Sequence, residues 1–294
     1  MQKDIMIWFQ GLFEGSYGFF DFFFTFITAF GEELILFIVL PIFYWAINKE
    51  MAQIGAVAGF ATMTLNGMIK DICEIERPIG TEGIRFVEVE NFLVDTVHLK
   101  EGSYSFPSGH SQTSSVMMFS IASYYNKKNL WIASTILVLL VMMSRIYLGV
   151  HWPLDVLIGG LLGVMSAVFF YKLLINKKED TRIKIYFIVA CICLIALLFA
   201  EKSDTYKSIG ASFGFALGAL IERKYVNFDP KEGTLTKKIL RCVIGILIVG
   251  GLKMGLKPLF GLIGDYFILD FFRYMILVFV AIAIYPMLFK KIKL

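Results

Sequence analysis

Charged side chains are scarce in this 294-residue chain, because only 18% of its residues are Asp, Glu, Lys or Arg. An ordinary soluble domain has about 25%. This scarcity excludes a plain water-soluble globule. The net charge is only +4, and the basic residues form short clusters rather than one basic face. Nucleic acid is therefore not an expected partner.

Cysteine and histidine are also few, at four and three residues. Cys191, Cys193 and Cys242 fall inside or at the end of apolar segments, which argues against a disulfide framework and against a thiolate metal site. No set of histidines and carboxylates has the spacing of metal ligands. We therefore expect a protein that uses no metal and no cofactor.

Apolar residues, in contrast, make up 57% of the chain, with 29 Phe and a mean hydropathy of +0.71. A membrane span needs about 20 mostly apolar residues. Such blocks recur along the whole chain, so we predict an all-α, polytopic membrane helix bundle of about nine spans. The candidates are Gly31 to Ile47, Ala52 to Ile69, Ser108 to Tyr124, Leu130 to Tyr147, Trp152 to Leu174, Ile183 to Ala200, Ile209 to Ile221, Ile239 to Leu256 and Arg273 to Phe289.

The first thirty residues are rich in aromatic side chains, with a Phe-rich run from Phe19 to Phe26. Glycines and acidic residues such as Asp21 interrupt this run. We interpret residues 1–30 as interfacial helices. A tenth span is the alternative.

The basic residues between the spans indicate the orientation. If the loop after the first span is cytoplasmic, most of the 28 Lys and Arg fall on that side, as the positive-inside rule expects. The long polar segment from Lys70 to Pro107 then lies on the outer side, and its length marks it as a functional loop. We predict an integral membrane protein of the bacterial plasma membrane, with its active site on the outer side. A protein of the eukaryotic reticulum is the alternative.

Three polar clusters interrupt the apolar pattern, and the alternation of spans brings all three to the outer face. The second span ends at Lys70, which Arg77 and Pro78 follow. The third begins at the sequence Pro-Ser-Gly-His, and the fourth and fifth meet at the third cluster. The members of the second and third clusters are Pro107, Ser108, Gly109, His110, Ser144, Arg145, His151 and Asp155. We therefore expect them to converge on one pocket.

The cations of these clusters point to a bound anion. Lys70, Arg77 and Arg145 lie near a membrane surface, where an unpaired charge is costly. Arginine can grip phosphate oxygens in a bidentate fork. Ser108 and Gly109 open a helix, and the free N–H groups at a helix start bind anions. Phosphate is the anion that fits best.

The histidines supply the chemistry. His151 and Asp155 lie four residues apart, so a helix beginning between them places both on one face. The carboxylate could accept the Nδ1 proton and leave Nε2 free to attack phosphorus. His110 is then the second imidazole, which could protonate the leaving oxygen and later accept a proton from water.

These three patterns, KxxxxxxRP at Lys70, PSGH at Pro107 and SRxxxxxHxxxD at Ser144, resemble the three-part signature of the type 2 phosphatidic acid phosphatase (PAP2) superfamily. All three match in the family's order. The resemblance implies a metal-independent lipid phosphatase with a phosphohistidine on His151, oriented by Asp155, and with His110 as acid and base. It implies phosphate binding by Lys70, Arg77, Ser108, Gly109 and Arg145.

The resemblance also suggests a division of the chain and a substrate. Residues 31–174 would form the catalytic core, after the interfacial residues 1–30, and residues 175–294 would add further spans. The outward N-terminus and the span number are more similar to glucose-6-phosphatase and the sphingosine-phosphate phosphatases than to six-span bacterial enzymes. A phosphorylated membrane lipid is the predicted substrate, and polyprenyl pyrophosphate, phosphatidate, phosphatidylglycerol phosphate and sphingoid phosphates are the candidates.

Other readings stay open at this point. A sugar phosphate is the alternative substrate, a non-catalytic phospholipid transporter or scaffold is the alternative class, and an acceptor other than water could intercept a phosphohistidine. Glycines at every fourth residue predict close helix packing, as at Gly210, Gly214 and Gly218, at Gly159 and Gly163, and at Gly251 and Gly255. That packing could be internal or could form a homodimer.

Overall fold

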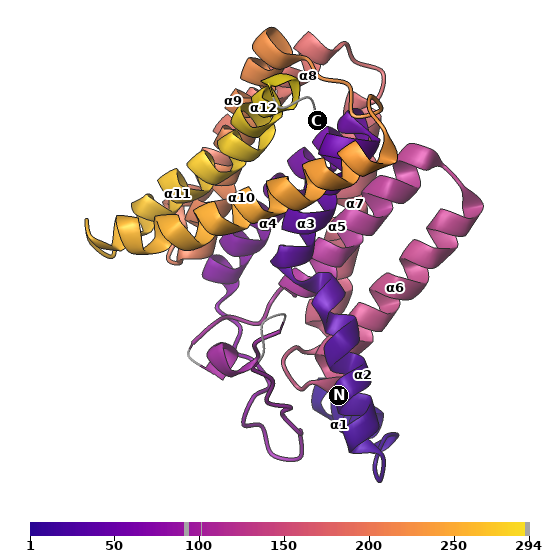
Figure 1. The fold of residues 1–294 in the computed structure, drawn as a ribbon. Coiled ribbons are helices and arrows are strands. Elements are labelled where there is room, and N and C mark those ends of the chain that lie inside the picture. The colour runs from indigo at the N-terminus through magenta and orange to yellow at the C-terminus, as the bar shows by residue number, and fades with distance from the viewer. Residues whose placement is uncertain (91–93, 101, 292–294) are drawn as a thin grey trace. The chain divides into compact units, whose positions relative to one another are not determined.

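The computed structural model describes residues 1–90, 94–100 and 102–291, and the regular structure in them is helical. One isolated antiparallel bridge joins Glu90 and Asp95. The long helices are α1 (Gln2–Gly11), α2 (Tyr17–Thr28), α3 (Glu33–Ile42), α4 (Lys49–Cys73), α5 (Gly109–Tyr125), α6 (Lys128–Tyr147), α7 (Pro153–Leu174), α8 (Glu179–Cys193), α9 (Ser203–Ile221), α10 (Leu235–Gly261), α11 (Phe267–Phe279) and α12 (Tyr285–Lys291) (Figure 1). Short 3₁₀ helices are η1 (Ala29–Gly31), η3 (Val97–Lys100) and η4 (Leu194–Leu198), and short π-helical segments are η2 (Phe43–Ile47), η5 (Glu222–Val226) and η6 (Val280–Ile284). The all-α prediction is confirmed.

Helices occupy all nine segments that the sequence predicts as spans. Five stretches of the described chain are long and apolar enough to cross a membrane, and a sixth candidate is a pair of helices bent by 55°. The five are Lys128–Tyr147, Pro153–Leu174, Glu179–Leu198, Leu235–Gly261 and Phe267–Phe289, and the bent pair is Tyr17–Gly31 with Leu36–Ile47. The protein is therefore a multi-pass membrane protein, and the count of nine spans stays a prediction.

The chain forms two compact units that interleave in sequence. The first consists of Met1–Leu36 and Ile69–Phe169, and the second of Phe37–Met68 and Phe170–Leu294. All predicted site residues belong to the first unit. The division into residues 1–30, 31–174 and 175–294 stays a prediction.

An aromatic cluster forms the core of the first unit. The rings of Phe24 in α2 and Tyr147 in α6 lie 4.4 Å apart between centroids. Leu148 and Val150, which are fully buried, pack in the same cluster. Both belong to the short link between α6 and α7, so burial of this cluster fixes the backbone of that link.

Buried polar contacts tie the N-terminal helices to the same place. The Gln10 amide donates to the carbonyl oxygens of Arg85 and Tyr147 at 2.7 and 2.8 Å, and it accepts from the Arg85 N–H at 2.9 Å. Asp21 forms an ion pair with Arg85 and accepts from the Tyr147 hydroxyl at 2.7 Å. The interfacial placement of residues 1–30 stays a prediction, but α1 and α2 are an integral part of the first unit.

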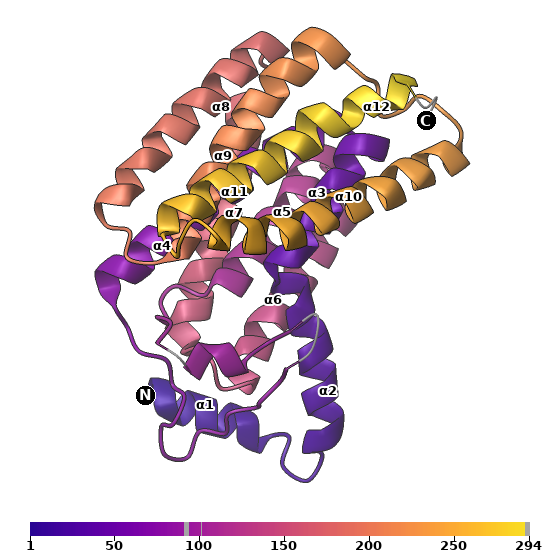
Figure 2. The ribbon, with the colours of Figure 1, turned by 60° about the vertical axis from the view of Figure 1, so that its left-hand side comes forward.

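Glycines allow two helices of the second unit, α9 and α11, to run side by side (Figure 2). A Cβ added at Gly210 would lie 2.1 Å from the carbonyl oxygen of Phe271, and one at Gly214 would lie 2.2 Å from that of Met275. Only glycine permits such an approach. The close packing predicted at every fourth residue is thus confirmed here, and it is internal to the chain.

The glycines of α10 behave differently. Within the part of the chain that the structure describes, no atom lies within 4 Å of a Cβ added at Gly250, Gly251 or Gly255. Within the described residues of this chain, Gly251 and Gly255 therefore have no close packing partner, and packing between two copies of the chain stays a prediction.

This contrast gives a matched pair of substitutions. Gly214→Ala is expected to lower the free energy of unfolding by about 1–3 kcal/mol, because a well-packed interface has no room for the methyl group. Gly250→Ala should be neutral or slightly stabilising, since alanine is the better helix former. Thermal unfolding in detergent, followed by tryptophan fluorescence, measures both. Equal midpoints for the two variants would contradict the packing of α9 against α11.

Candidate active site

The three polar clusters converge within the first unit, as the alternation of spans predicted. The Ser108 N–H donates to the carbonyl oxygen of Asp155 at 3.0 Å, which joins the start of α5 to the start of α7. A Cβ added at Gly159 would lie 2.5 Å from the Ser108 carbonyl oxygen, so glycine permits this approach. Lys70 lies in the last turn of α4 and Arg145 in the last turn of α6, so the ends of four helices contribute.

Local sequence explains why helices start at this place. Ser108 is the N-cap of α5, and its side chain accepts from the backbone N–H of Ser111, as serine commonly does at this position. Proline suits the first helical position, and Pro153 begins α7. The Asp155 carboxylate accepts from the N–H of Trp152 at 2.8 Å. Gly109 is the first residue of α5, beside the free N–H groups of its first turn.

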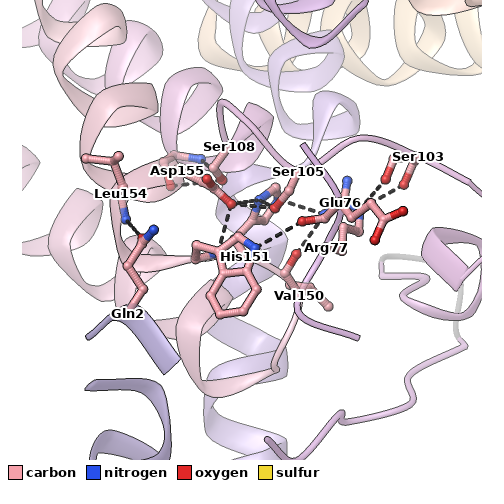
Figure 3. Close-up of polar contacts among 12 residues, drawn as sticks. Gln2, Glu76, Arg77, Ser103, Ser105, Ser108, Val150, His151, Leu154 and Asp155 are labelled. Atoms are coloured by element: carbon pink, nitrogen blue, oxygen red, sulfur yellow. Dashed lines mark hydrogen bonds and ion pairs between the residues drawn. The ribbon is translucent and has the colours of Figure 1, made fainter. Parts of the chain in front are cut away.

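His151 lies in the link between α6 and α7 and is only 1% exposed. Its Nδ1 atom is 3.5 Å from the Asp155 carboxylate and 3.3 Å from the Ser105 hydroxyl, which itself donates to that carboxylate (Figure 3). Its Nε2 atom is 3.0 Å from Nη1 of Arg77. A guanidinium has only donors, so Nε2 accepts and the proton of the neutral ring is on Nδ1.

Arg77 is held rigidly in place. Its Nη1 atom also donates to the Val150 carbonyl oxygen at 2.9 Å, and its Nε atom donates to the hydroxyl of Ser103 at 2.8 Å (Figure 3). Burial, and then the positive charge of Arg145, lower the pKa of Arg77 to about 9. The guanidinium therefore remains charged at neutral pH.

Cations surround His151. Burial lowers the pKa of His151 well below its ordinary value of 6.5, and the charges of Arg77, Arg145 and Lys70 lower this pKa further. Lys70 is thus within electrostatic range of the imidazole. At neutral pH the ring is uncharged, and its Nε2 lone pair accepts the hydrogen bond from Arg77.

Arg145 is a buried guanidinium with unused donors. The residue is 1% exposed, and its Nη1 atom donates to the Thr28 hydroxyl at 2.9 Å. Among the residues that the structure describes, its Nε and Nη2 atoms have no hydrogen-bond partner. A buried charge is stable only with an opposite charge or further hydrogen bonds, so these donors are suited to a bound anion.

His110 lies in the first turn of α5 and contacts a residue far away in the sequence. Its Nε2 atom is 2.9 Å from a carboxylate oxygen of Glu32. His110 is itself within electrostatic range of His151. In the described parts of the chain, no group of three or more His, Cys, Asp or Glu side chains could hold a metal ion.

Sequence reasoning missed three of these residues, namely Thr28, Glu32 and Ser105. None belongs to the three motifs, and Glu32 lies 78 positions from His110. One signal was available for Glu32, because an acidic residue at the edge of an apolar segment is a candidate functional residue. Thr28 and Ser105 carried no comparable signal.

Comparison with known proteins decides the family. Residues 51–179 match the PAP2 superfamily, and residues 206–294 match the transmembrane extension of PAP2 superfamily phosphatases. This chain belongs to the PAP2 superfamily. The first match contains all three motifs, and the second covers most of the C-terminal helices of this PAP2 protein.

Relatives of this PAP2 chain include several lipid phosphatases. Sphingosine-1-phosphate phosphatase 1 of Rattus norvegicus is 27% identical over 255 residues, which cover 77% of this chain and 57% of that protein. Lipid A 4'-phosphatase of Bacteroides thetaiotaomicron is 26% identical over 156 residues, or 50% of this chain and 66% of that protein. Undecaprenyl-diphosphatase of Sulfolobus acidocaldarius is 44% identical over 75 residues, or 25% of this chain and 36% of that protein.

The chain spans about half the length of the sphingosine-1-phosphate phosphatases it matches. No solved structure gives a significant match to it.

Proposed function

We propose that this PAP2 protein is a membrane phosphatase that hydrolyses a lipid phosphate or diphosphate through a phosphohistidine on His151. One observation carries the proposal. Nδ1 of His151 faces Asp155, and its Nε2 lone pair is directed at Arg77, 3.0 Å away. A phosphoryl group held by Arg77 would therefore lie beside the nucleophilic nitrogen.

The reaction follows from these positions. Nε2 of His151 forms a bond to phosphorus, and the bond from phosphorus to the lipid oxygen breaks with its electron pair on that oxygen. His110 gives this oxygen a proton. A water molecule then attacks phosphorus and gives a proton to His110, and the phosphorus–nitrogen bond breaks with its electron pair returning to Nε2. Asp155 stabilises the positive charge that the imidazole carries in between.

The surrounding cations would hold the phosphate without a metal. Arg145 has two buried nitrogens with unused donors in the described structure, and Lys70 lies within electrostatic range of His151. The Ser108 N–H already donates to the Asp155 carbonyl oxygen, so the N–H of Gly109, the first residue of α5, is the one of this pair that can bind an anion at the helix start. Fixed donors of this kind stabilise the charge on a transferring phosphoryl group.

The class of substrate rests on the relatives. The match to sphingosine-1-phosphate phosphatase 1 extends over 77% of this chain, and the other two relatives are named for phosphorylated lipids. We propose a phosphorylated membrane lipid, reached from the outer leaflet of a bacterial plasma membrane. The bias of basic residues to the opposite side supports this placement.

A panel of substrates tests the proposal. Purified protein in detergent is given sphingosine 1-phosphate, phosphatidate, undecaprenyl diphosphate and glucose 6-phosphate, and released phosphate is measured with and without EDTA. We expect turnover of at least one lipid, little turnover of the sugar phosphate, and no effect of EDTA. Preference for the sugar phosphate would replace the lipid assignment. Loss of activity with EDTA and its return with magnesium would refute metal-free catalysis.

The pKa of His151 gives a prediction about pH. Only the neutral imidazole can attack, so activity needs a pH above this pKa, and a lowered pKa extends activity toward acid. We expect the acid limb of kcat/KM to lie below pH 6.5, the ordinary value for histidine. The pKa of the substrate's phosphate is measured separately, and the pH profile of kcat/KM is corrected for it. An acid limb above pH 6.5 would contradict the burial and the cationic surroundings of His151.

A further inference from the structure

The end of α2 and the turn that follows it contact two residues of the proposed site. Thr28 accepts a hydrogen bond from Arg145 at 2.9 Å. A Cβ added at Gly31 would lie 2.8 Å from Cβ of His110, so the segment passes against the start of α5. Glu32 contacts His110 directly. The match to the PAP2 superfamily begins only at residue 51. Thr28, Gly31 and Glu32 precede it, and none of the three belongs to the sequence motifs.

The contact between Glu32 and His110 defines how the imidazole is oriented. The carboxylate oxygen lies 2.9 Å from Nε2, and the two side chains are only 24% and 20% exposed. An ionised carboxylate only accepts, so Nε2 carries a proton in this contact. The hydrogen bonds described at His110 leave Nδ1 unused, so Nδ1 is the nitrogen that can face the substrate.

We propose that Glu32 is a positioning residue that prepares His110 to act as the general acid. The inference rests on the function proposed above. With Nε2 held by the carboxylate, the protonated ring directs its Nδ1–H to the leaving oxygen. When that proton is transferred, the neutral ring keeps its Nε2–H bond to Glu32 and has a free Nδ1, which can accept the proton of the attacking water.

The charges around His110 explain why a carboxylate is needed. Arg145 on α6 and Arg77 in the loop before α5 both face His110, and two cations oppose a third positive charge on the imidazole. Glu32 is the carboxylate that offsets part of this effect, and the negative charge of the bound phosphate is expected to offset the rest. Arg145 in turn faces Glu32 and favours its ionised form.

This role predicts a dependence on the leaving group. An alkoxide, as released from a lipid phosphate, needs a proton before it can depart, and proton transfer from a general acid typically contributes 10²–10⁴-fold. A nitrophenolate leaves without one. Loss of a residue that acts through the general acid therefore slows hydrolysis of a lipid phosphate and hardly affects hydrolysis of a nitrophenyl phosphate. General damage to the site slows both reactions.

The test compares Glu32→Gln with Glu32→Asp. The matched control is Glu14→Gln, an exposed acid in the turn between α1 and α2. Initial rates are measured on a lipid phosphate that the wild-type protein hydrolyses and on p-nitrophenyl phosphate. We expect Glu32→Gln to reduce kcat on the lipid about 10²-fold, and kcat on the aryl phosphate less than about threefold.

The pH profile supplies a second readout. In Glu32→Gln the basic limb of the lipid reaction should move to lower pH, because the protonated His110 has lost its stabilising charge. Glu32→Asp should recover part of the lost rate and should return the basic limb part of the way to its wild-type pH. Glu14→Gln should match the wild type in both. Equal loss on both substrates, or an unchanged basic limb, would overturn the role of Glu32. Wild-type protein that hydrolyses neither substrate would instead overturn the proposed function.

Discussion

His151→Gln is expected to lower phosphate release from a lipid phosphate by about 10⁴-fold or more, since removal of an enzyme nucleophile commonly costs this much or more. Glutamine has no ring nitrogen that can form a bond to phosphorus. The variant should still bind the substrate, because Arg77, Arg145 and Lys70 remain. Initial rates and substrate binding to the purified variant in detergent measure both effects.

The control for this experiment is His98→Gln. His98 is an exposed histidine of the loop between α4 and α5, and its side chain lies 3.4 Å from Asp95. We expect this variant to retain the wild-type rate within about twofold, as most exposed substitutions leave the structure unchanged. Turnover by His151→Gln at more than a few per cent of the wild-type rate would mean that another group attacks phosphorus.

Arg145→Leu is expected to lower kcat/KM by about 10²–10³-fold, the range found when one donor to a developing oxyanion is removed. The guanidinium is buried and has two nitrogens with no partner among the described residues. Arg145→Lys should recover only a small part of the loss, since an ammonium cannot form a bidentate contact. Steady-state kinetics on the same lipid substrate measures both variants.

Stability separates loss of phosphate binding from misfolding. A buried charge whose donors lack partners is costly, so Arg145→Leu should unfold at the same temperature as the wild type or above it. The control is Arg223→Leu in the second unit, whose side chain is 38% exposed and paired with Glu179. We expect it to keep full activity. An Arg145→Leu protein with wild-type kcat/KM would show that this arginine does not hold the phosphoryl group.

The sequence predicted much of the site, because its members occur in short motifs at the ends of apolar segments. Alternation of spans is enough to bring Lys70, Ser108 and His151 to one face of the membrane. The Thr28 and Glu32 contacts could not be predicted in this way. They join the second cluster and Arg145 to a segment more than seventy positions earlier, and no local pattern encodes such a pairing.

The fold was predicted as far as composition determines it. A long apolar block predicts a helix, and helices occupy all the predicted segments. Whether a helix spans the membrane depends also on which side chains face protein rather than lipid. In α5, for example, Ser111, Ser114 and Ser115 are fully buried. The mean hydropathy of a sequence window does not show which side chains are buried against protein. For the same reason the buried role of Gln10 in holding α1 was not visible.

The most direct test is to trap the intermediate. Purified protein is mixed with a ³²P-labelled lipid phosphate, quenched in base within milliseconds and digested, and the labelled peptide is identified. We predict a base-stable, acid-labile label on the peptide that contains His151, absent from His151→Gln and retained in His98→Gln. An acid-stable label, or a label on any other residue, would contradict attack by this imidazole, as would single-turnover phosphate release with no labelled protein at any time.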